Sequence, residues 1–306
     1  MTPTDSYAIE TSGLNYIFRY GRKVVNEVNL QVPDKSIFGF LGPNGAGKTT
    51  TIRLLTGMLE NEPDNIFIRG KSLKKNIPGI FGSMGTLIET PSLYLHLSGR
   101  DNLRVITRLR NMNESRVEEI LKIVGLHNDA KRKVKEYSLG MKQRLAVGMA
   151  LLPNPSLLIL DEPANGLDPS GIIEVREMLI RLNREHGITI LISSHLLGEV
   201  EKTCTHVGII HKGILKFQGT MAELQNNAGH GKLVTIKIGD ALQWKNLLAE
   251  KFPQATVTQN NEFIFPLQDA DEVTRINQQL VMDGVPVKSI RLNEGLEEWF
   301  IKMTSN

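Results

Sequence analysis

A glycine-rich segment near residue 45 has the spacing of a phosphate-binding loop. The sequence GFLGPNGAGKTT places Gly42, Gly47, Lys48 and Thr49 in the pattern G-x-x-x-x-G-K-[ST]. The additional Gly45 lets successive amide N–H groups turn toward one anion, and the following helix adds partial positive charge at its N-terminus. In such a loop the Lys48 side chain reaches the β- and γ-phosphates of a nucleotide, and the Thr49 hydroxyl coordinates Mg²⁺.

Two further segments place acid–base side chains directly after hydrophobic runs. SLLILDEP brings Asp161 and Glu162 to the end of a predicted strand, and ITILISSH ends at His195. Asp161 can hold the hydration shell of Mg²⁺, Glu162 can orient and deprotonate an attacking water, and His195 can contact a γ-phosphate. Alone, the acid pair could be a charge pair at a helix N-terminus and His195 a helix cap. Together with the phosphate loop, they favour phosphoryl transfer.

The elements that must bring these residues together are parallel strands. The segments 36–41, 157–160 and 188–193 are short, leucine-rich or β-branched, and bounded by turn residues, as buried parallel strands are. A helical pattern covers 170–186 and ends at Gly187. Strands that alternate with helices predict an α/β domain whose ligand site lies at the carboxyl ends of the strands.

Two regions outside this core have a different pattern of predicted elements. Residues from about 90 to 152 are mostly helical and predict a helical lobe inserted between strands. After an Asn- and Gly-rich boundary at 226–231, alternating strands and helices resume, including a hairpin around Asn260 and Asn261. The sequence therefore predicts an ATPase domain over residues 1–228 and a small α+β accessory domain over 229–306.

Composition narrows the possible function classes. The 306 residues include 36 basic and 33 acidic side chains, a net charge of +3 that does not support a polyelectrolyte binder of nucleic acids. The single cysteine, Cys204, excludes an intrachain disulfide and favours a reducing compartment. No apolar run approaches the roughly 18 residues needed to span a bilayer, and the N-terminal residues do not form a secretory signal. We expect a cytosolic chain that reaches a membrane only through a partner.

The order of these motifs resembles that of ATP-binding cassette (ABC) ATPases. A phosphate loop, an Asp-Glu strand, an NGLD loop and a strand-end histidine follow one another as in that family, over residues 8 to about 220. The family's signature, usually Leu-Ser-Gly-Gly-Gln, corresponds here to YSLGM at 137–141, which keeps only the serine and the second glycine. The resemblance implies an ABC-type P-loop fold, with a mixed sheet core and the helical lobe.

The resemblance also implies roles for individual residues. Two subunits pair head to tail in this family, so the signature residues would contact the ATP held by the partner, and Ser138 and the Gly140 amide could serve its γ-phosphate. Glu89 stands where most members carry a glutamine near Mg²⁺, and Tyr20 matches the aromatic that stacks on adenine. The implied nucleotide contacts are Tyr20, Gly42, Pro43, Asn44, Gly45, Ala46, Gly47, Lys48, Thr49 and Thr50. The remaining assignments are Glu162 and His195 for catalysis, Thr49, Asp161 and Glu89 for the metal, Ser138, Gly140 and Met141 in the signature, and Asp168 in the NGLD loop.

The LIE-x-P variant around Glu89 and the closing GLEEWFIKMT resemble the ATPases of bacterial exporters for bacitracin, nisin and related peptide antibiotics. This resemblance implies an energy-coupling subunit that uses ATP and Mg²⁺, pairs with a second copy and acts on a separately encoded permease at the cytoplasmic side of the cell membrane. Two alternatives remain. One is a membrane-free ABC ATPase of translation or DNA repair. Such relatives generally carry two cassettes, zinc-binding cysteines or a long coiled-coil insertion, whereas this chain has one cassette, one cysteine and a short interval between Lys48 and Ser138. The other is an importer ATPase.

Overall fold

The structure is a computed structural model that describes residues 6–18, 21–60, 63–89, 92–228, 232–239, 241–257, 262–267, 272–293, 300 and 303–304. The chain divides into two compact units, residues 1–221 and residues 222–306. The sequence predicted a boundary seven residues later, after residue 228. The intervening residues form α8 (Met221–Ala228).

A six-stranded sheet positions the phosphate loop and the acid–base residues of unit 1. Its order is β12 (Ile214–Thr220), β11 (His206–His211), β5 (Ile37–Leu41), β10 (Thr189–Ser194), β9 (Leu157–Leu160) and β8 (Met84–Leu87). Strands β11, β5, β10, β9 and β8 run parallel, whereas β12 is antiparallel at the edge. Because β5, β10 and β9 are adjacent and parallel, their carboxyl ends meet at one edge of the sheet. The three strands predicted from the sequence are these three.

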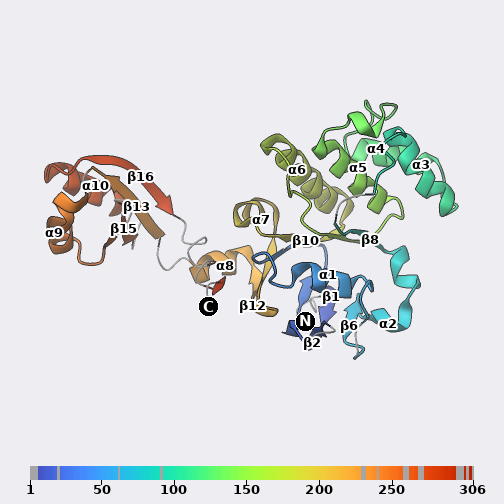
Figure 1. Ribbon diagram of the computed structural model, residues 1–306, viewed down its shortest axis with the longest axis horizontal. Helices are drawn as coiled ribbons and strands as arrows, with labels where there is room; N and C mark the ends of the chain where they lie inside the picture. Colours follow the sequence, from blue (N-terminus) through green and yellow to red (C-terminus); the bar gives the residue numbers. More distant parts are fainter. Residues whose placement is uncertain are drawn as a thin grey trace. The chain divides into compact units, whose positions relative to one another are not determined.

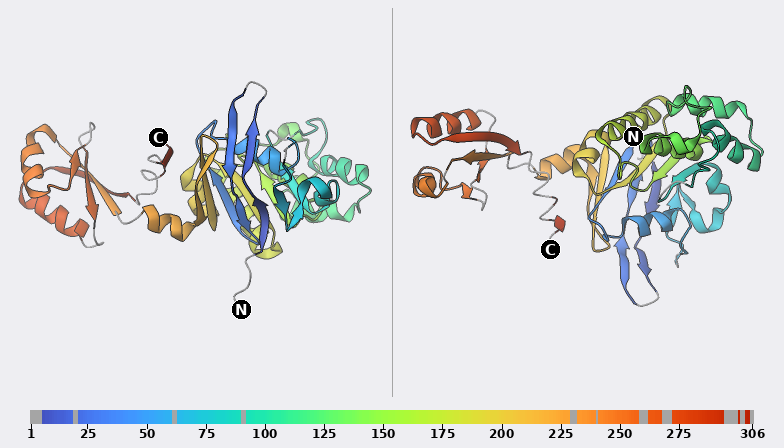
Figure 2. Two further views of the ribbon diagram at one scale, coloured as in Figure 1. Left: turned by 90° about the horizontal axis from the view of Figure 1, so that it is seen from below. Right: turned by 45° about the horizontal axis from the view of Figure 1, so that its top comes forward.

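A second, antiparallel layer covers one face of this sheet. Its strands are β4 (Gln31–Pro33), β1 (Tyr7–Thr11), β6 (Ile66–Ile68) and β7 (Lys71–Ser72). One hydrophobic core joins the layers, with Phe38 and Phe40 of β5 and Ile9 of β1 all completely buried. Strands β2 (Leu14–Ile17) and β3 (Lys23–Val28) pair as a hairpin that projects from unit 1 (Figure 2).

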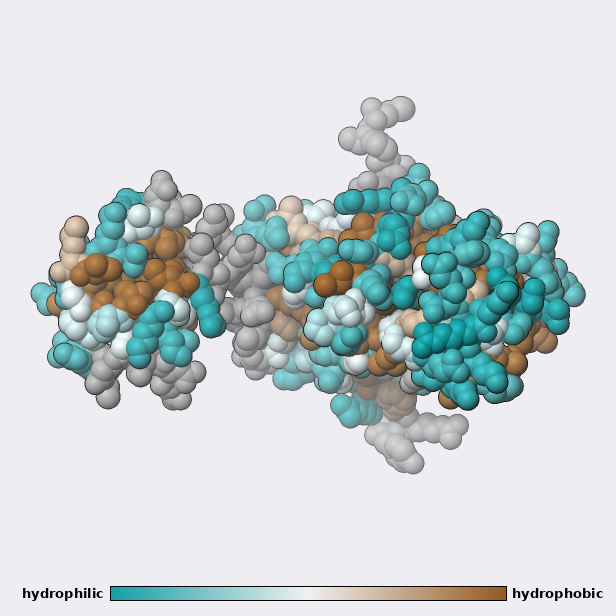
Figure 3. Space-filling view, turned by 90° about the horizontal axis from the view of Figure 1, so that it is seen from above, coloured by the Kyte–Doolittle hydropathy of each residue, from teal (hydrophilic) through white to brown (hydrophobic). Residues whose placement is uncertain are grey.

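Helices surround the sheet and form the lobe (Figure 1). Those beside the six-stranded sheet include α6 (Pro169–His186) and α7 (Leu197–Thr203), while α1 (Lys48–Leu55) follows β5 and α2 (Leu73–Asn76) contacts β6 and β7 of the antiparallel layer. The helical lobe consists of α3 (Gly99–Leu109), α4 (Ser115–Ile123) and α5 (Leu139–Leu151), between β8 and β9 in the sequence. The predicted mixed sheet with an inserted helical lobe is confirmed. The surface of unit 1 seen in Figure 3 is mainly hydrophilic, with separate hydrophobic areas.

Unit 2 is the predicted small α+β fold. The strands β14 (Thr256–Val257), β15 (Glu262–Leu267), β13 (Lys232–Ile238) and β16 (Val287–Asn293) form one antiparallel sheet in that order. With α9 (Ala241–Lys251) and α10 (Glu272–Met282), the chain order is β-α-β-β-α-β, a split β-α-β arrangement. Its core includes Phe263, Phe265 and Leu280. Strands β14 and β15 form the predicted hairpin, while its turn at Asn260 and Asn261 lies outside the described residues.

Candidate nucleotide-binding and catalytic site

The phosphate loop connects the end of β5 to the start of α1. Gly47 is the N-cap of α1 and has φ 109°, a backbone conformation that glycine adopts without the steric cost of a side chain. A Cβ atom at this position would also lie 2.7 Å from the Val24 carbonyl oxygen. The loop therefore needs glycine here both for its conformation and for its close approach to β3. It presents the N-terminus of an eight-residue helix, which favours an anion.

Lys48 is buried at the first position of α1, with 6% of its surface exposed. Its Nζ donates a hydrogen bond to the Gly42 carbonyl oxygen at 2.7 Å and lies 3.2 Å from Oε1 of Glu162. A buried ammonium group needs such partners because its desolvation is costly. The charge of Lys48 is thereby held directly over the loop that it belongs to.

Asp161, which follows β9, accepts hydrogen bonds from α1 on one side and from β10 on the other. Its Oδ2 accepts a hydrogen bond from Thr49 Oγ1 at 2.8 Å, and its Oδ1 accepts one from Ser193 Oγ. The Ser193 hydroxyl oxygen also accepts a hydrogen bond from the Glu162 amide at 2.8 Å. Sequence reasoning missed Ser193, although a polar residue at the end of the buried strand before His195 was a signal that could have found it.

Glu162 lies between the side chains of Lys48 and His195. Its Oε1 faces Lys48, and its Oε2 lies 2.8 Å from Nδ1 of His195. The residue has φ 48°, an uncommon backbone conformation for a side chain other than glycine or asparagine. The parallel pairing of β9 with β10 brings Glu162 and His195 together, although they are 33 residues apart.

Lys48, Glu162 and His195 line an open cavity of about 430 Å³, a size suited to a small ligand. Its walls are formed by Phe18, Arg22, Val24, Asn44, Gly45, Gly47, Lys48, Thr49, Thr50, Glu162, Asn165 and His195. Phe18 and Arg22 were not predicted from the sequence. Phe18 is 41% exposed, and its ring packs edge-on against Tyr16. Tyr20, the predicted adenine contact, lies outside the described residues.

The signature residues do not line this cavity in the part of the chain that the structure describes. Ser138 caps α5, and its Oγ accepts a hydrogen bond from the Met141 amide at 3.2 Å. Ser138 is exposed, whereas Gly140 is buried against Gly171 of α6. Asp168 caps α6 in the same way by accepting a hydrogen bond from the Gly171 amide at 3.1 Å. Within one chain, Ser138 and Asp168 are thus outside the cavity that contains Lys48.

Glu89 also lies outside the cavity lining. It follows β8 with φ 66°, is 57% exposed, and pairs with the Arg53 guanidinium of α1. Thr49 and Asp161, the other two predicted metal ligands, are in contact with each other. The role of Glu89 toward a metal therefore remains a prediction, and in this conformation its charge is balanced by Arg53.

The sheet order, the phosphate loop and the paired carboxylates define a P-loop ATPase with an inserted helical lobe. Comparison with known proteins agrees, because the family model for "ABC transporter" matches residues 25–165. A bacitracin transport ATP-binding protein of Enterococcus faecalis is 37% identical over 97% of this chain and 96% of its own length. The chain belongs to the ATP-binding subunits of ABC transporters, and it is an ATPase that binds ATP.

Two other similarities concern the ATPase unit. A lantibiotic transport ATP-binding protein of Streptococcus pyogenes is 41% identical over 68% of this chain and 92% of its own length. The solved structure of cbiO1 from Clostridium perfringens, part of the transporter complex cbiONQ, matches with a TM-score of 0.65 at 27% identity. The match extends over 73% of this chain and 95% of the cbiO1 chain. In the described part of this chain, no helix is long and apolar enough to cross a membrane.

Proposed function

We propose that the chain is the energy-coupling subunit of a bacterial ABC exporter for peptide antibiotics or chemically related cargo. The observation that carries the proposal is the position of the Glu162 carboxylate between Lys48 and His195, at the mouth of the phosphate loop. The similarity to bacitracin and lantibiotic transport proteins over most of the chain supports the choice of cargo.

Glu162 acts as the general base in this proposal. A carboxylate at the end of β9 can accept the proton of a water placed opposite the leaving group. His195 orients the carboxylate through the contact at Oε2, and Lys48 moves from Glu162 to the phosphate oxygens when nucleotide occupies the loop. In this step the proton of the attacking water is transferred to Glu162, and no other proton donor is needed.

Mg²⁺ fits the donor set beside the phosphate loop. The Thr49 hydroxyl and the Asp161 carboxylate already lie 2.8 Å apart, and oxygen ligands of this kind are those that Mg²⁺ prefers. Bound there, the ion would supply charge neutralisation for the phosphate oxygens. Ser193 would keep Asp161 oriented through its hydrogen bond to the second carboxylate oxygen.

The site is completed by a second copy of the chain, packed head to tail. Ser138, at the N-terminus of the 13-residue α5, is exposed and lies outside the cavity of its own subunit. A helix N-terminus of this kind would serve the γ-phosphate of the ATP held by the partner. Asp168, which caps α6 near the contact of Gly171 with Gly140, would lie at the same subunit interface.

A separately encoded permease would bind residues 87–103, here called the docking segment, and hold the subunit at the cytoplasmic side of the membrane. Among the described residues of the segment, Tyr94 is 49% exposed and Leu95 is 51% exposed. Exposed apolar side chains of this size suit a protein partner. The segment includes Glu89, which stands close to α1 through its pairing with Arg53.

The experiment that tests the catalytic assignment is the Glu162→Gln variant. The amide preserves the size of the side chain but cannot accept the proton, so we expect hydrolysis to fall by roughly 10²-fold or more while ATP binding stays near normal. The measurement is steady-state phosphate release alongside equilibrium binding of ATP. Glu185→Gln, at an exposed site on α6, is the matched control. Hydrolysis by Glu162→Gln at the rate of this control would refute the assigned base.

A further inference from the structure

Two segments of the helical lobe run side by side, and they link the docking segment to the signature. Residues 95–100 exchange backbone hydrogen bonds with residues 130–135 at distances of 2.9 to 3.2 Å. The pairs are Lys135 N to Leu95 O, Val134 N to Leu97 O, Gly99 N to Arg132 O, and Arg100 N to Ala130 O. The first of these segments carries the exposed Leu95, and the second leads directly to Ser138. The two proposed contact regions are thus joined by a continuous set of bonds.

The side chain of Tyr137 packs between these two segments, beside Gly99. Tyr137 is 4% exposed, and its hydroxyl donates a hydrogen bond to the Asp129 carbonyl oxygen at 2.8 Å. A Cβ atom at Gly99 would lie 2.2 Å from the same hydroxyl oxygen. Gly99 is therefore the residue that lets the phenol reach its partner, and a larger residue there has to displace the ring. Burial, with a smaller contribution from Asp129, raises the pKa of Tyr137, and the neutral hydroxyl is the form that donates this hydrogen bond.

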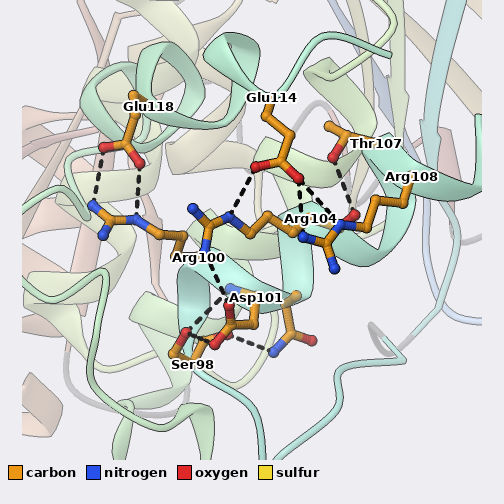
Figure 4. A network of polar contacts seen from close by, with 9 residues as sticks. Ser98, Arg100, Asp101, Arg104, Thr107, Arg108, Glu114 and Glu118 are labelled. Carbon is orange, nitrogen blue, oxygen red and sulfur yellow. Dashed lines mark hydrogen bonds and ion pairs between the residues drawn. The ribbon is translucent and has the colours of Figure 1, made fainter. Parts of the chain in front are cut away.

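The start of α3, where Gly99 lies, is held on its other sides (Figure 4). Ser98 caps the helix by accepting a hydrogen bond from the Asp101 amide at 3.1 Å. Arg100 makes two contacts with Glu118 of α4, at 2.8 and 3.0 Å. Asn102, which is completely buried, bonds the backbone amide and carbonyl of Tyr94. A shift of the segment around Tyr94 would therefore carry the start of α3 with it.

We propose that the contact of Tyr137 with Gly99 is a positioning contact that sets Ser138 relative to the docking segment. Tyr137 immediately precedes Ser138, whose Oγ caps α5. A change at Tyr94 or Leu95 reaches Gly99 through α3, then the phenol, and then the serine that the partner's γ-phosphate would meet. This inference rests on the proposed function, because it assigns the docking segment and the signature their roles.

The test uses two single variants and their combination. Gly99→Ala should lower kcat for ATP hydrolysis about tenfold, with the ATP affinity of the monomer unchanged, because the methyl group displaces the phenol beside Ser138. Tyr137→Leu removes the hydroxyl and shortens the side chain. Adding it to Gly99→Ala should therefore restore kcat to within about threefold of the Tyr137→Leu value.

The outcomes separate this inference from the proposed function. A wild-type chain that does not hydrolyse ATP would refute the proposed function. If the wild-type chain hydrolyses ATP, two results would refute the positioning contact alone: an unchanged kcat in Gly99→Ala, or no recovery of kcat in the double variant. A thermal midpoint measured for each variant shows whether kcat follows stability, and a kcat loss that follows stability across all three variants would also overturn the proposal.

A fluorescence experiment measures the proposed connection between Tyr137 and the docking segment directly. Cys204 is 7% exposed, and burial raises the pKa of its thiol, so a fluorophore can be attached selectively to Leu95→Cys. In the Glu162→Gln background, ATP should change the fluorescence of this label, and adding Tyr137→Leu should reduce that change by at least about half at saturating ATP. A label that does not respond to ATP, or that responds equally in both backgrounds, would overturn the proposal.

Discussion

Individual residues of the site were predictable where a motif fixes both type and spacing. Lys48, Thr49, Asp161, Glu162 and His195 all fall within one connected set of contacts, as the order of the motifs indicated. The pairing of Glu162 with Lys48 was not predictable, because it depends on the positive φ of Glu162 and on which strands are neighbours. Glu89 shows the same limit, since its pairing with Arg53 is a three-dimensional contact between residues 36 positions apart.

Ser193 provides a prediction at this scale. Its buried hydroxyl is bonded to both Asp161 and the Glu162 amide, so Ser193→Ala leaves two polar groups without their partner. We expect the free energy of unfolding to fall by about 1–3 kcal/mol and the Mg²⁺ concentration for half-maximal hydrolysis to rise. Chemical denaturation and a Mg²⁺ titration of ATPase activity measure the two effects. Ser115→Ala, an exposed serine of α4, is the control. Equal Mg²⁺ requirements in the two variants would contradict the role assigned to Ser193.

At the scale of the elements, the buried strands beside the phosphate loop and helix α6 were predicted well. Strands β5, β9 and β10 and helix α6 lie within one residue of their predicted positions, because the strands are continuous apolar runs bounded by turn residues and the helix has a clear apolar period. The antiparallel layer was not predicted. Strands such as β4, β6 and β7 have two or three residues, too few to distinguish alternation from a loop. The pairing of β4 and β6 is decided by the core that Val32, Ile66 and Ile68 share with β5.

The docking segment provides the prediction for the elements. A Leu95→Cys variant carrying a photoactivatable cross-linker should attach to a polytopic membrane protein in membranes of the native host, because the side chain at this position is half exposed on a firmly bonded segment. The cross-linked protein is identified by mass spectrometry in the presence and absence of ATP. Glu185→Cys, an exposed position on α6, is the control. The same yield and the same products from both positions would contradict docking at residues 87–103.

At the scale of the whole molecule, the two units have separate cores. The core of unit 1 contains Phe38 and Phe40, whereas that of unit 2 contains Phe263 and Phe265. The lantibiotic transport relative is matched over 92% of its length by 68% of this chain, so a relative exists with little sequence beyond the ATPase unit. Each unit therefore has the means to fold independently.

This separation predicts the behaviour of a shortened chain. A variant that ends after residue 228 should remain folded and bind ATP within about twofold of the full chain, because the residues that line the nucleotide cavity all precede residue 196. Circular dichroism and equilibrium binding of ATP are the measurements. A shortened chain that keeps its helical content but loses ATP binding would show that unit 2 contributes to the nucleotide site, contrary to this expectation.

The head-to-tail pairing makes a prediction that depends on two copies of the chain. Ser138→Arg should block hydrolysis while each subunit still binds ATP, because the added bulk and charge would lie at the partner's γ-phosphate. Ser138 also caps α5, and its loss costs about 1 kcal/mol of stability, so Ser138→Ala serves as the control for the cap. Lys48→Ala should instead weaken nucleotide binding in its own subunit.

Mixing the two variants distinguishes action between subunits from action within one. In a heterodimer of Ser138→Arg and Lys48→Ala subunits, one composite site carries both changes and the other carries neither. An equal mixture should therefore recover up to about a quarter of the wild-type ATPase rate if one intact site turns over independently, because half of the dimers are mixed. Each variant alone should stay inactive, since both of its sites are damaged. If instead Ser138→Arg weakens ATP binding by the monomer as strongly as Lys48→Ala does, the signature acts within its own chain, and the pairing that we propose is wrong.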